Sequence, residues 1–326
     1  MNKEHEPGLI AAVLLDGKGG GHQVGWSDIE KWSPSAETLW IHMDYADPAA
    51  GAWILDRSGL DPTIAQALVA EETRPRSLAT RGGLLVILRG ANLNEGADAD
   101  DMIAVRAWIE ANRIITTRHR PTRAIETIRV SIETGDGPTD PGDFLVQLAD
   151  GLTARASDAI SDLEDEVDKL EDEVLSAESY ELRGKIAEFR RSAIRFRRYL
   201  APQKDVLTRL QSERVEWLSD IDRAHLREIG DRTLRLVEDL DSARDRAAVA
   251  QDELNNRLTE QMNRTMYVLS IVAGIFLPLG LLTGLLGINV GGMPGVDSEW
   301  AFIVVCVVLV LTGVFLTAFF RRKGWI

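Results

Sequence analysis

Two long uncharged segments near the C-terminus restrict what this 326-residue chain can fold into. The first covers residues 266–289 and the second residues 301–320, and neither contains Asp, Glu, His, Lys or Arg. At a rise of about 1.5 Å per residue, a helix of either length crosses the roughly 30 Å hydrocarbon core of a bilayer. We therefore expect a first transmembrane helix over 266–289 and a second over 301–320.

A short polar loop joins the two expected spans, and a basic tail follows the second. The loop, residues 290–300, carries the acids Asp297 and Glu299 and no basic residue. Basic residues stand on the other side of both spans, at Arg257 and Arg264 and in the tail 321–326. Because basic flanks remain in the cytosol, we expect a multi-pass protein of the cell inner membrane with both termini cytosolic. Two helices of one chain leave no lumen between them, so an aqueous pore requires an oligomer.

The net charge of the chain limits its partners. A formal charge of −14 at pH 7 argues against a nucleic acid as partner, because phosphates repel an acidic surface. The same charge suits a protein that handles cations, although acids that only keep a cytosolic domain soluble would also produce it. The single cysteine, Cys306, lies inside the second span, so no disulfide framework and no thiolate metal cluster are expected. The N-terminus lacks a basic start and an apolar core, which indicates no cleavable signal.

Residues 1–140 have the pattern of a cytosolic α/β domain. Asp61 followed by Pro62 predicts a helix start, and Pro121 precedes a second helix that extends to about Glu133. No catalytic arrangement is evident, so neither an enzymatic activity nor a cofactor is expected. The apolar run that ends at Leu88 and the next one, separated by an acidic segment, predict a hairpin. Short apolar runs with strand character occur at residues 9–15, 38–43, 83–88, 102–109 and 113–117.

Residues 141–213 are expected to form a charged helical hairpin. Residues 157–181 hold eleven acids and one Lys, whereas residues 183–204 hold eight basic residues and one acid. A solvated hairpin with structural charges is one interpretation, and an acidic arm that attracts divalent cations is the other. Pro202 either interrupts the second helix or marks a kink in it. The two helices would pair antiparallel through an apolar seam of Leu163, Val167, Leu170 and Val174.

A single long helix is expected to begin at about Ser219. No proline occurs between there and Pro278, and the intervening residues are strong helix formers apart from Gly230. Such a helix would extend to about Leu286 and measure about 100 Å. Residues 214–265 would then form a stalk that continues directly into the first span.

One face of this helix changes character along its length. We call this face the stripe, and it comprises positions within about 60° of one line, counted back from Gly284 at 100° per residue. The stripe is polar in the stalk, thioether and aliphatic at the cytosolic membrane edge, and small toward the outside. A ring of helices around a water-filled axis explains both the polar residues of the stalk and the small residues of the span. A close-packed seam between two helices explains only the small residues. The stripe consists of Gly284, Gly280, Leu277, Ala273, Leu269, Met266, Met262, Thr259, Asn255 and Asp252.

Asn289 would stand about 140° away from the stripe if the helix continued that far. It reaches the same axis only if the helix ends first, and Gly287 is expected to end it. An amide at the outer mouth offers an uncharged oxygen to the water shell of an ion, although an Asn after Gly can also act as a helix C-cap. Rings of Met266, Leu269 and Leu277 predict a hydrophobic constriction.

Gly287, Ile288 and Asn289, followed by a short loop, a second span and a basic tail, resemble the CorA family of divalent-cation transporters. That family has Gly-Met-Asn at this place. Ile288 and the loop that follows it are similar instead to the zinc-transport branch, and the resemblance extends from Asp222 to Pro294. It implies an α+β membrane protein that forms a funnel-shaped homopentamer, with an N-terminal α/β domain, a long helical stalk and two C-terminal spans. Asn289 would lie in the mouth, and the stripe would line the path.

The resemblance implies transport of divalent metal cations, in particular uptake of Zn²⁺ through a pentameric pore with proton coupling. A Mg²⁺ or Co²⁺ channel of the same family is one alternative, and a membrane-anchored coiled-coil sensor without transport is another. The histidines are scattered, so a tetrahedral zinc cage is not expected and the ion should pass largely hydrated. Because the spans lack charged residues, Asp297, Glu299 and Asp252 are the candidates for any pH dependence.

Overall fold

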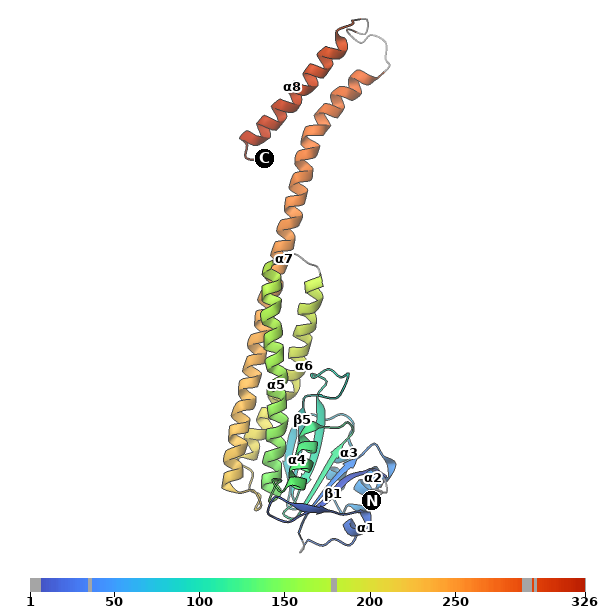
Figure 1. Cartoon of the computed structure of the whole chain (residues 1–326), viewed down its shortest axis with the longest axis vertical. Helices are drawn as coiled ribbons and strands as arrows, with labels where there is room; N and C mark the ends of the chain where they lie inside the picture. Colours follow the sequence, from blue (N-terminus) through green and yellow to red (C-terminus); the bar gives the residue numbers. More distant parts are fainter. Residues whose placement is uncertain (1–6, 35–36, 177–180, 289–294, 296–297, 326) are drawn as a thin grey trace. The chain divides into compact units, whose positions relative to one another are not determined.

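The computed structural model describes residues 7–34, 37–176, 181–288, 295 and 298–325. It divides into two compact units, Met1–Gln251 and Asp252–Ile326. Each unit has its own architecture. The N-terminal unit is a layered α/β domain with long helices, and the C-terminal unit consists of the last part of one long helix and a second helix (Figure 1).

The N-terminal unit is built on a seven-stranded sheet with the spatial order β2-β1-β3-β7-β6-β5-β4. Each neighbouring pair is antiparallel except β3 with β7, which is parallel. All five expected strands are present, and the expected hairpin is the antiparallel pair β5 and β6. The strands are β1 (Leu9–Leu15), β2 (Gly21–Gln23), β3 (Thr38–Asp44), β4 (Arg76–Ala79), β5 (Leu84–Gly90), β6 (Ile103–Ile109) and β7 (Arg113–Arg118).

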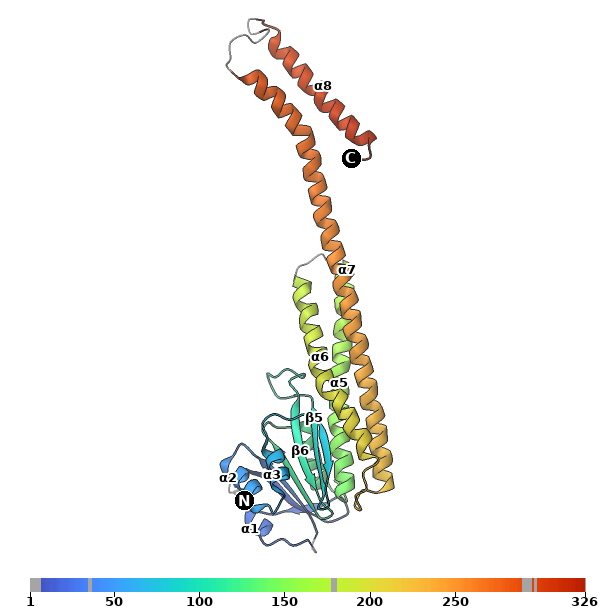
Figure 2. The ribbon, with the colours of Figure 1, turned by 180° about the vertical axis from the view of Figure 1, so that it is seen from behind.

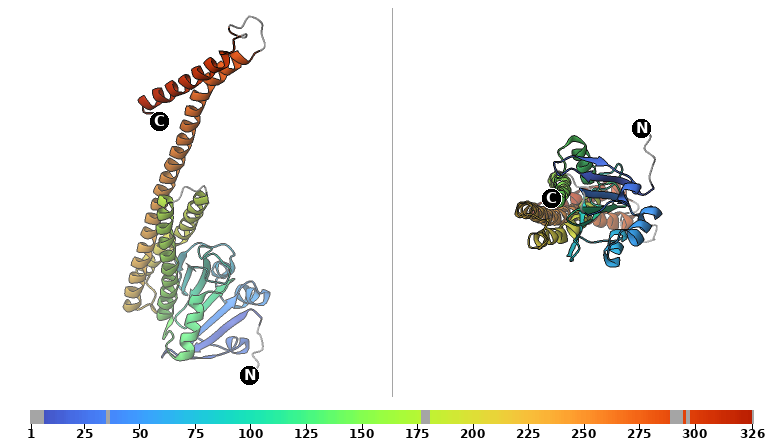
Figure 3. Two further views of the ribbon diagram at one scale, coloured as in Figure 1. Left: turned by 45° about the horizontal axis from the view of Figure 1, so that its top comes forward. Right: turned by 90° about the horizontal axis from the view of Figure 1, so that it is seen from below.

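Helices cover both faces of this sheet. One face carries α1 (Trp26–Ile29), α2 (Pro48–Ala52), the π-helical turn η1 (Trp53–Arg57) and α3 (Pro62–Val69). The other face carries α4 (Arg123–Thr134), α5 (Pro141–Ser176), α6 (Glu181–Leu210) and the first part of α7 (Asp220–Gly287). Figure 2 shows the long helices side by side, and the end view in Figure 3 places them on one side of the sheet.

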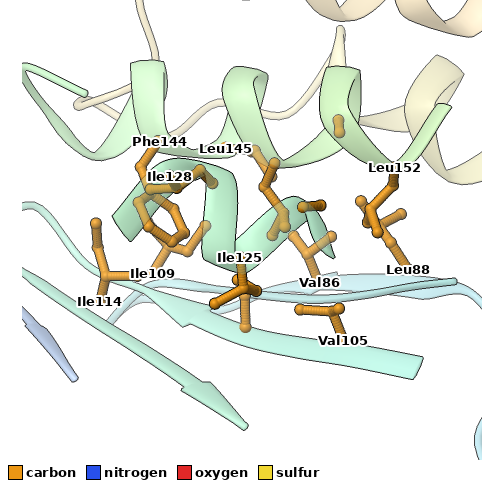
Figure 4. Packing of buried hydrophobic residues seen from close by; sticks show 14 of the residues in the cluster. Val86, Leu88, Val105, Ile109, Ile114, Ile125, Ile128, Phe144, Leu145 and Leu152 are labelled. Atoms are coloured by element: carbon orange, nitrogen blue, oxygen red, sulfur yellow. The ribbon is translucent and has the colours of Figure 1, made fainter. Parts of the chain in front are cut away.

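The strands supply two separate cores because successive side chains of a strand point to opposite faces. In β5, Val86 and Leu88 belong to the core under the long helices, whereas Leu85 and Ile87 belong to the core under the short helices. Figure 4 shows the first of these cores, where side chains of α4 and α5 pack onto β5, β6 and β7. The ring of Phe144 of α5 packs at a tilt against the ring of Trp40 of β3, with 5.2 Å between the ring centroids.

Helix ends in the N-terminal unit follow the local sequence signals. Asp61 caps α3, since its Oδ1 accepts a hydrogen bond from the N–H of Thr63 at 2.8 Å and Pro62 occupies the first turn. Helix α4 begins at Arg123 and ends at Gly135, which has a φ of 86° in the left-handed region. A glycine adopts this conformation without strain, which explains why the helix stops there.

The charged helices α5 and α6 lie side by side, and the four residues of the expected seam are all buried. Helix α6 continues through Pro202, so this proline does not interrupt it. The next residue, Gln203, is buried, and its Oε1 accepts a hydrogen bond from the N–H of Arg89 at 2.6 Å. The expected turn near Ser179 lies outside the described residues.

The C-terminal unit consists of the remainder of α7 and of α8 (Ala301–Arg322). Helix α7 is continuous over 68 residues, as expected, and corresponds to about 100 Å at 1.5 Å per residue. The most apolar 18-residue windows of α7 and α8 have mean hydropathies of 2.2 and 2.9, and no residue in either window is buried. Both helices are long and apolar enough to cross a membrane.

Candidate ion pathway

The burial of side chains along α7 changes at Leu258. Between residues 259 and 288 no side chain is buried. Leu269 and Leu277 are 68% and 73% exposed, so apolar surface is uncovered here. A bilayer or further copies of the chain can cover it, because apolar surface of this extent is unfavourable in water. Before this change, buried residues recur every three or four positions at Leu226, Ile229, Thr233, Leu236, Leu240, Ala243, Ala247, Ala250, Leu254 and Leu258.

Helix α8 lies along one side of the last part of α7 (Figures 1 and 2). A Cβ atom on Gly274 would lie 2.9 Å from Phe320 of α8, and one on Gly313 of α8 would lie 3.9 Å from Leu279. Small residues therefore allow the two helices to approach each other. The half-buried positions of α7 here, at about 80° to 220° from Gly284 on the helix, are Ile271, Gly274, Ile275, Pro278, Leu279 and Leu282.

The stripe lies on the side of α7 that α8 leaves uncovered. Met262 and Met266 are 54% and 53% exposed, and Ala273 is exposed. A Cβ atom on Gly280 or Gly284 would meet nothing within 4 Å. In the stalk part of the stripe, Asp252 and Thr259 are exposed and Asn255 is half-buried. The stripe is thus one accessible face that extends from the polar stalk into the apolar span.

Helix α7 ends at Gly287, where it was expected to end. Ile288 follows in a bend and is 49% exposed. Glu299 is exposed in the turn before α8. Asn289 and Asp297 lie outside the described residues, so their expected roles at the mouth remain predictions.

Ser270 is a polar residue of the span that the sequence reasoning passed over. It lies about 40° from the line of Gly284 and is therefore on the same side of α7 as the residues of the stripe. Its hydroxyl donates a hydrogen bond to the carbonyl of Met266 at 2.8 Å, and Thr283 similarly donates to Leu279 at 3.0 Å. Such bonds satisfy hydroxyl groups inside an apolar span. A lone serine in an otherwise apolar run was the signal that could have identified this position.

Within the described residues, no group of three or more His, Cys, Asp or Glu side chains could hold a metal ion. His42 belongs to β3 and is fully buried, and burial together with the nearby Arg118 lowers its pKa to about 3. This histidine is therefore neutral, and its Nδ1 lies 2.8 Å from the Thr116 hydroxyl of β7. Its role in the sheet is structural.

Some acids of α5 have structural partners. Arg246 of α7 pairs with Asp168 and Glu171, and these hydrogen bonds, first to Glu171 and then to Asp168, raise its pKa. Glu173 pairs with Lys185 of α6 at 2.9 Å. These contacts favour a structural role for the charges in this part of the acidic arm. They also show that α7 is a third helix in this set of ion pairs.

Comparison with known proteins places this architecture in a family. A family model described as CorA-like Mg²⁺ transporter protein matches residues 35–322. The divalent cation transporter CmaX of Pseudomonas aeruginosa is 39% identical over 324 residues, which is 98% of each chain. The zinc transport protein ZntB of Pectobacterium carotovorum is 38% identical over 319 residues, which is 98% of this chain and 96% of that relative.

Solved structures of transporters have the same fold as this chain. The structure of full-length CmaX is 38% identical with a TM-score of 0.85 and covers 99% of this chain and 100% of its own. The CorA magnesium transporter of Methanocaldococcus jannaschii has the same fold, with a TM-score of 0.82 at 22% identity over 97% of this chain and 99% of its own. With its α/β domain, its long helix and its two apolar C-terminal helices, the chain belongs to the CorA-like Mg²⁺ transporter family.

Proposed function

We propose that the chain carries Zn²⁺ into the cell through a homopentameric pore in the inner membrane. The family and the relatives CmaX and ZntB are named for the transport of divalent metal cations. The stripe supports the proposal of a pore, because α8 covers the opposite side of α7 and leaves the stripe accessible. Transport rather than catalysis is therefore the proposed activity.

The stripe is the proposed lining of the pore. Two helices of one chain enclose no lumen, so α7 of several copies must surround the path. Gly280 and Gly284 leave room for a hydrated ion at the outer part, and Asp252 and Thr259 offer polar groups in the stalk. Exposed Met266, Leu269 and Leu277 would form the hydrophobic constriction, because apolar rings in a narrow pore can exclude water.

The proposed orientation places the loop before α8 outside and both termini in the cytosol. The last turn of α8 contains Arg321 and Arg322, and these basic residues follow the rule that basic flanks remain inside. Asn289 would then face the outer mouth, where its amide oxygen can accept hydrogen bonds from water bound to the arriving ion.

Zn²⁺ is proposed as the cargo because Ile288 stands where magnesium transporters of this family have Met, and because ZntB relatives are zinc transport proteins. The description of the family model names Mg²⁺, which makes a Mg²⁺ channel the second candidate. The exchange Ile288→Met separates the two, since it restores the family motif without changing charge. It should raise Mg²⁺ flux relative to Zn²⁺ flux.

The deciding experiment is ion uptake by purified protein in lipid vesicles. Zn²⁺, Mg²⁺ and Co²⁺ are offered separately, with and without an imposed pH gradient, while native mass measurement gives the oligomeric state. Zn²⁺ flux into vesicles by a pentamer is the expected result, with proton-driven uptake if the gradient accelerates it. A stable dimer or an assembly without flux would contradict the pore and favour a membrane-anchored sensor.

Proton coupling has its own test, because the spans offer no charged relay. We expect the pH profile of uptake to depend on carboxylates that flank the pore. The double variant Asp297→Asn, Glu299→Gln and the single variant Asp252→Asn should each change that profile. If neither changes it, protons move with pore water instead.

A further inference from the structure

The last residues of α8 and the turn that follows them combine three cations with a folded-back tryptophan. Arg321, Arg322 and Lys323 are all exposed. Within the described part of the chain, none of the three forms an ion pair with an acidic side chain. Trp325 follows two residues later and is 50% exposed. We call residues 321–325 the basic turn.

The basic turn has a defined geometry that holds Trp325 in place. Gly324 has a φ of 73°, in the left-handed region that glycine adopts without strain, and it turns the chain back. The N–H of Trp325 donates a hydrogen bond to the carbonyl of Phe320 at 2.9 Å. The two rings stack with 5.6 Å between their centroids and 14° between their planes. Phe320 in turn packs close to Gly274 of α7. The tryptophan is therefore fixed beside the three cations.

The length of α8 places the basic turn at the boundary of a bilayer. The helix has 22 residues, which corresponds to about 33 Å at 1.5 Å per residue. This length matches the roughly 30 Å hydrocarbon core of a membrane. When α8 crosses that core, its last residues lie at the level of the lipid headgroups. Tryptophan side chains favour this level, because the ring is apolar and the indole N–H can donate a hydrogen bond.

The opposite end of α8 has a different charge. Trp300 is also exposed there, at 69%, but the charged residue next to it is the acid Glu299. The sequence contains no Lys or Arg between Arg264 and Arg321. Both ends of α8 thus offer an exposed tryptophan, and one of them combines it with cations. The two ends should therefore interact with different lipids.

We propose that the basic turn binds the headgroup of an anionic phospholipid. The guanidinium groups of Arg321 and Arg322 can donate paired N–H bonds to the phosphate oxygens, and the ammonium of Lys323 adds a compact positive charge. A zwitterionic headgroup carries its own cation and gains less from these three residues. Trp325 would lie against the lipid at the edge of the apolar core. The proposal holds for any cargo and any number of copies, so it goes beyond the proposed transport.

The test measures lipid preference at Trp325 itself. The full chain with Trp300→Phe is reconstituted into mixed vesicles of phosphatidylcholine and phosphatidylglycerol, and one of the two lipids carries bromine in its acyl chains. Bromine quenches indole fluorescence on contact, so exchanging the brominated lipid gives the relative binding constant beside Trp325. The variant Trp300→Phe, Trp325→Phe supplies the background of the N-terminal tryptophans. We expect phosphatidylglycerol to bind at least about fivefold more strongly than phosphatidylcholine.

Removal of the three cations should abolish this preference. In the Trp300→Phe background, the variant Arg321→Gln, Arg322→Gln, Lys323→Gln should bind the two lipids equally within about twofold, because both then meet an uncharged turn. Quenching by brominated phosphatidylcholine should persist, which shows that the variant is still inserted. An unchanged preference for phosphatidylglycerol would overturn the proposal. An absence of quenching by either lipid in the parent would also overturn it.

A matched control removes the same number of charges from exposed positions of the N-terminal unit, with the variant Arg74→Gln, Arg76→Gln, Arg81→Gln. It should keep the full preference, and an equal loss would show a general effect of net charge and overturn the proposal. The same measurement at Trp300, in the variant Trp325→Phe, should give no preference for phosphatidylglycerol. Equal preference at both ends of α8 would contradict a specific site. Loss of the preference in millimolar inorganic phosphate would show a site for soluble anions instead.

Discussion

The two parts of helix α7 differ in what covers their side chains. Before Leu258, apolar residues such as Leu226 and Leu240 are buried within the N-terminal unit at intervals of three or four residues. Beyond Leu258, apolar residues on several faces remain exposed, such as Leu269 on the stripe and Val268 on the opposite side of the helix. One helix therefore stabilises a folded domain with its first part and leaves the apolar surface of its second part uncovered, with the length and composition of a membrane span.

The largest difference between the two parts should appear in stability. Leu240→Ala removes a side chain that is 1% exposed and should destabilise the N-terminal unit by about 2–5 kcal/mol, since it leaves a cavity. Leu269→Ala removes an exposed side chain and should change stability by less than about 0.5 kcal/mol. Thermal unfolding in detergent, followed by the fluorescence of tryptophans such as Trp40, measures both. Equal losses of stability in the two variants would contradict the difference between the two parts of α7.

The next largest effect is expected for ion transport at the outer end of α7. Asn289→Ala should reduce Zn²⁺ flux at least about tenfold, which corresponds to about 1.4 kcal/mol in the barrier, and should leave the oligomer intact. The control is Asn256→Ala, which removes an exposed amide of the stalk that is outside the stripe. Flux and native mass are measured on the same preparations. Normal flux in Asn289→Ala would show that Asn289 has no role in transport and acts only as a helix cap.

A smaller effect should distinguish the stripe from the rest of the span. Leu269→Ser should raise resting leak by roughly a few-fold, because a hydroxyl in a narrow apolar ring favours water. Leu286→Ser is the matched control, since Leu286 is also exposed but lies on another face of α7. Leak is measured as ion flux through the closed protein in vesicles. Equal leak in both variants would place the constriction elsewhere.

The smallest predicted effect concerns a like-charge contact between α5 and the first part of α7. Burial of Glu164, and then the charges of Asp239 and Asp168, raise its pKa. The folded protein therefore binds this proton more tightly than the unfolded chain. The ionised carboxylate then costs stability above the folded pKa, and this cost disappears below the unfolded pKa.

Glu164→Gln should accordingly stabilise the protein at pH 7 by no more than a few tenths of a kcal/mol, since water screens this partly exposed group. At a pH below the unfolded pKa of about 4.5, the variant and the parent should unfold alike, because both side chains are then uncharged. Thermal unfolding across this pH range measures the difference. A destabilised variant at pH 7 would show that Glu164 has a favourable partner instead.

Short edge strands and the strand order were beyond what the sequence could indicate. Strands β2 and β4 contain three and four residues, which is too few for a periodic signal. The parallel pairing of β3 with β7 joins segments separated by more than sixty residues, so no local pattern encodes it. The sheet order follows from packing the two alternating faces of the strands against two sets of helices.

The partners of the charged helices were also set by tertiary structure. Opposite charge in α5 and α6 predicted that these two helices pair with each other, and Lys185 with Glu173 does so. Yet Arg246 of α7 binds acids of α5, and Arg197 of α6 binds Asp241 of α7 at 2.7 Å. Charge is visible in a sequence, but the choice among several opposite charges depends on which helices pack together.

The sequence by itself determined the two apolar spans, the continuous helix from Asp220 to Gly287 and the resemblance to the CorA family, because composition, helical periodicity and short motifs are local properties. Only the tertiary structure decided which side of α7 is covered by α8. The contacts of Gly274 and Gly313 leave the stripe accessible, and they depend on two segments that meet in space. A helical wheel identifies faces, whereas packing decides which face is covered.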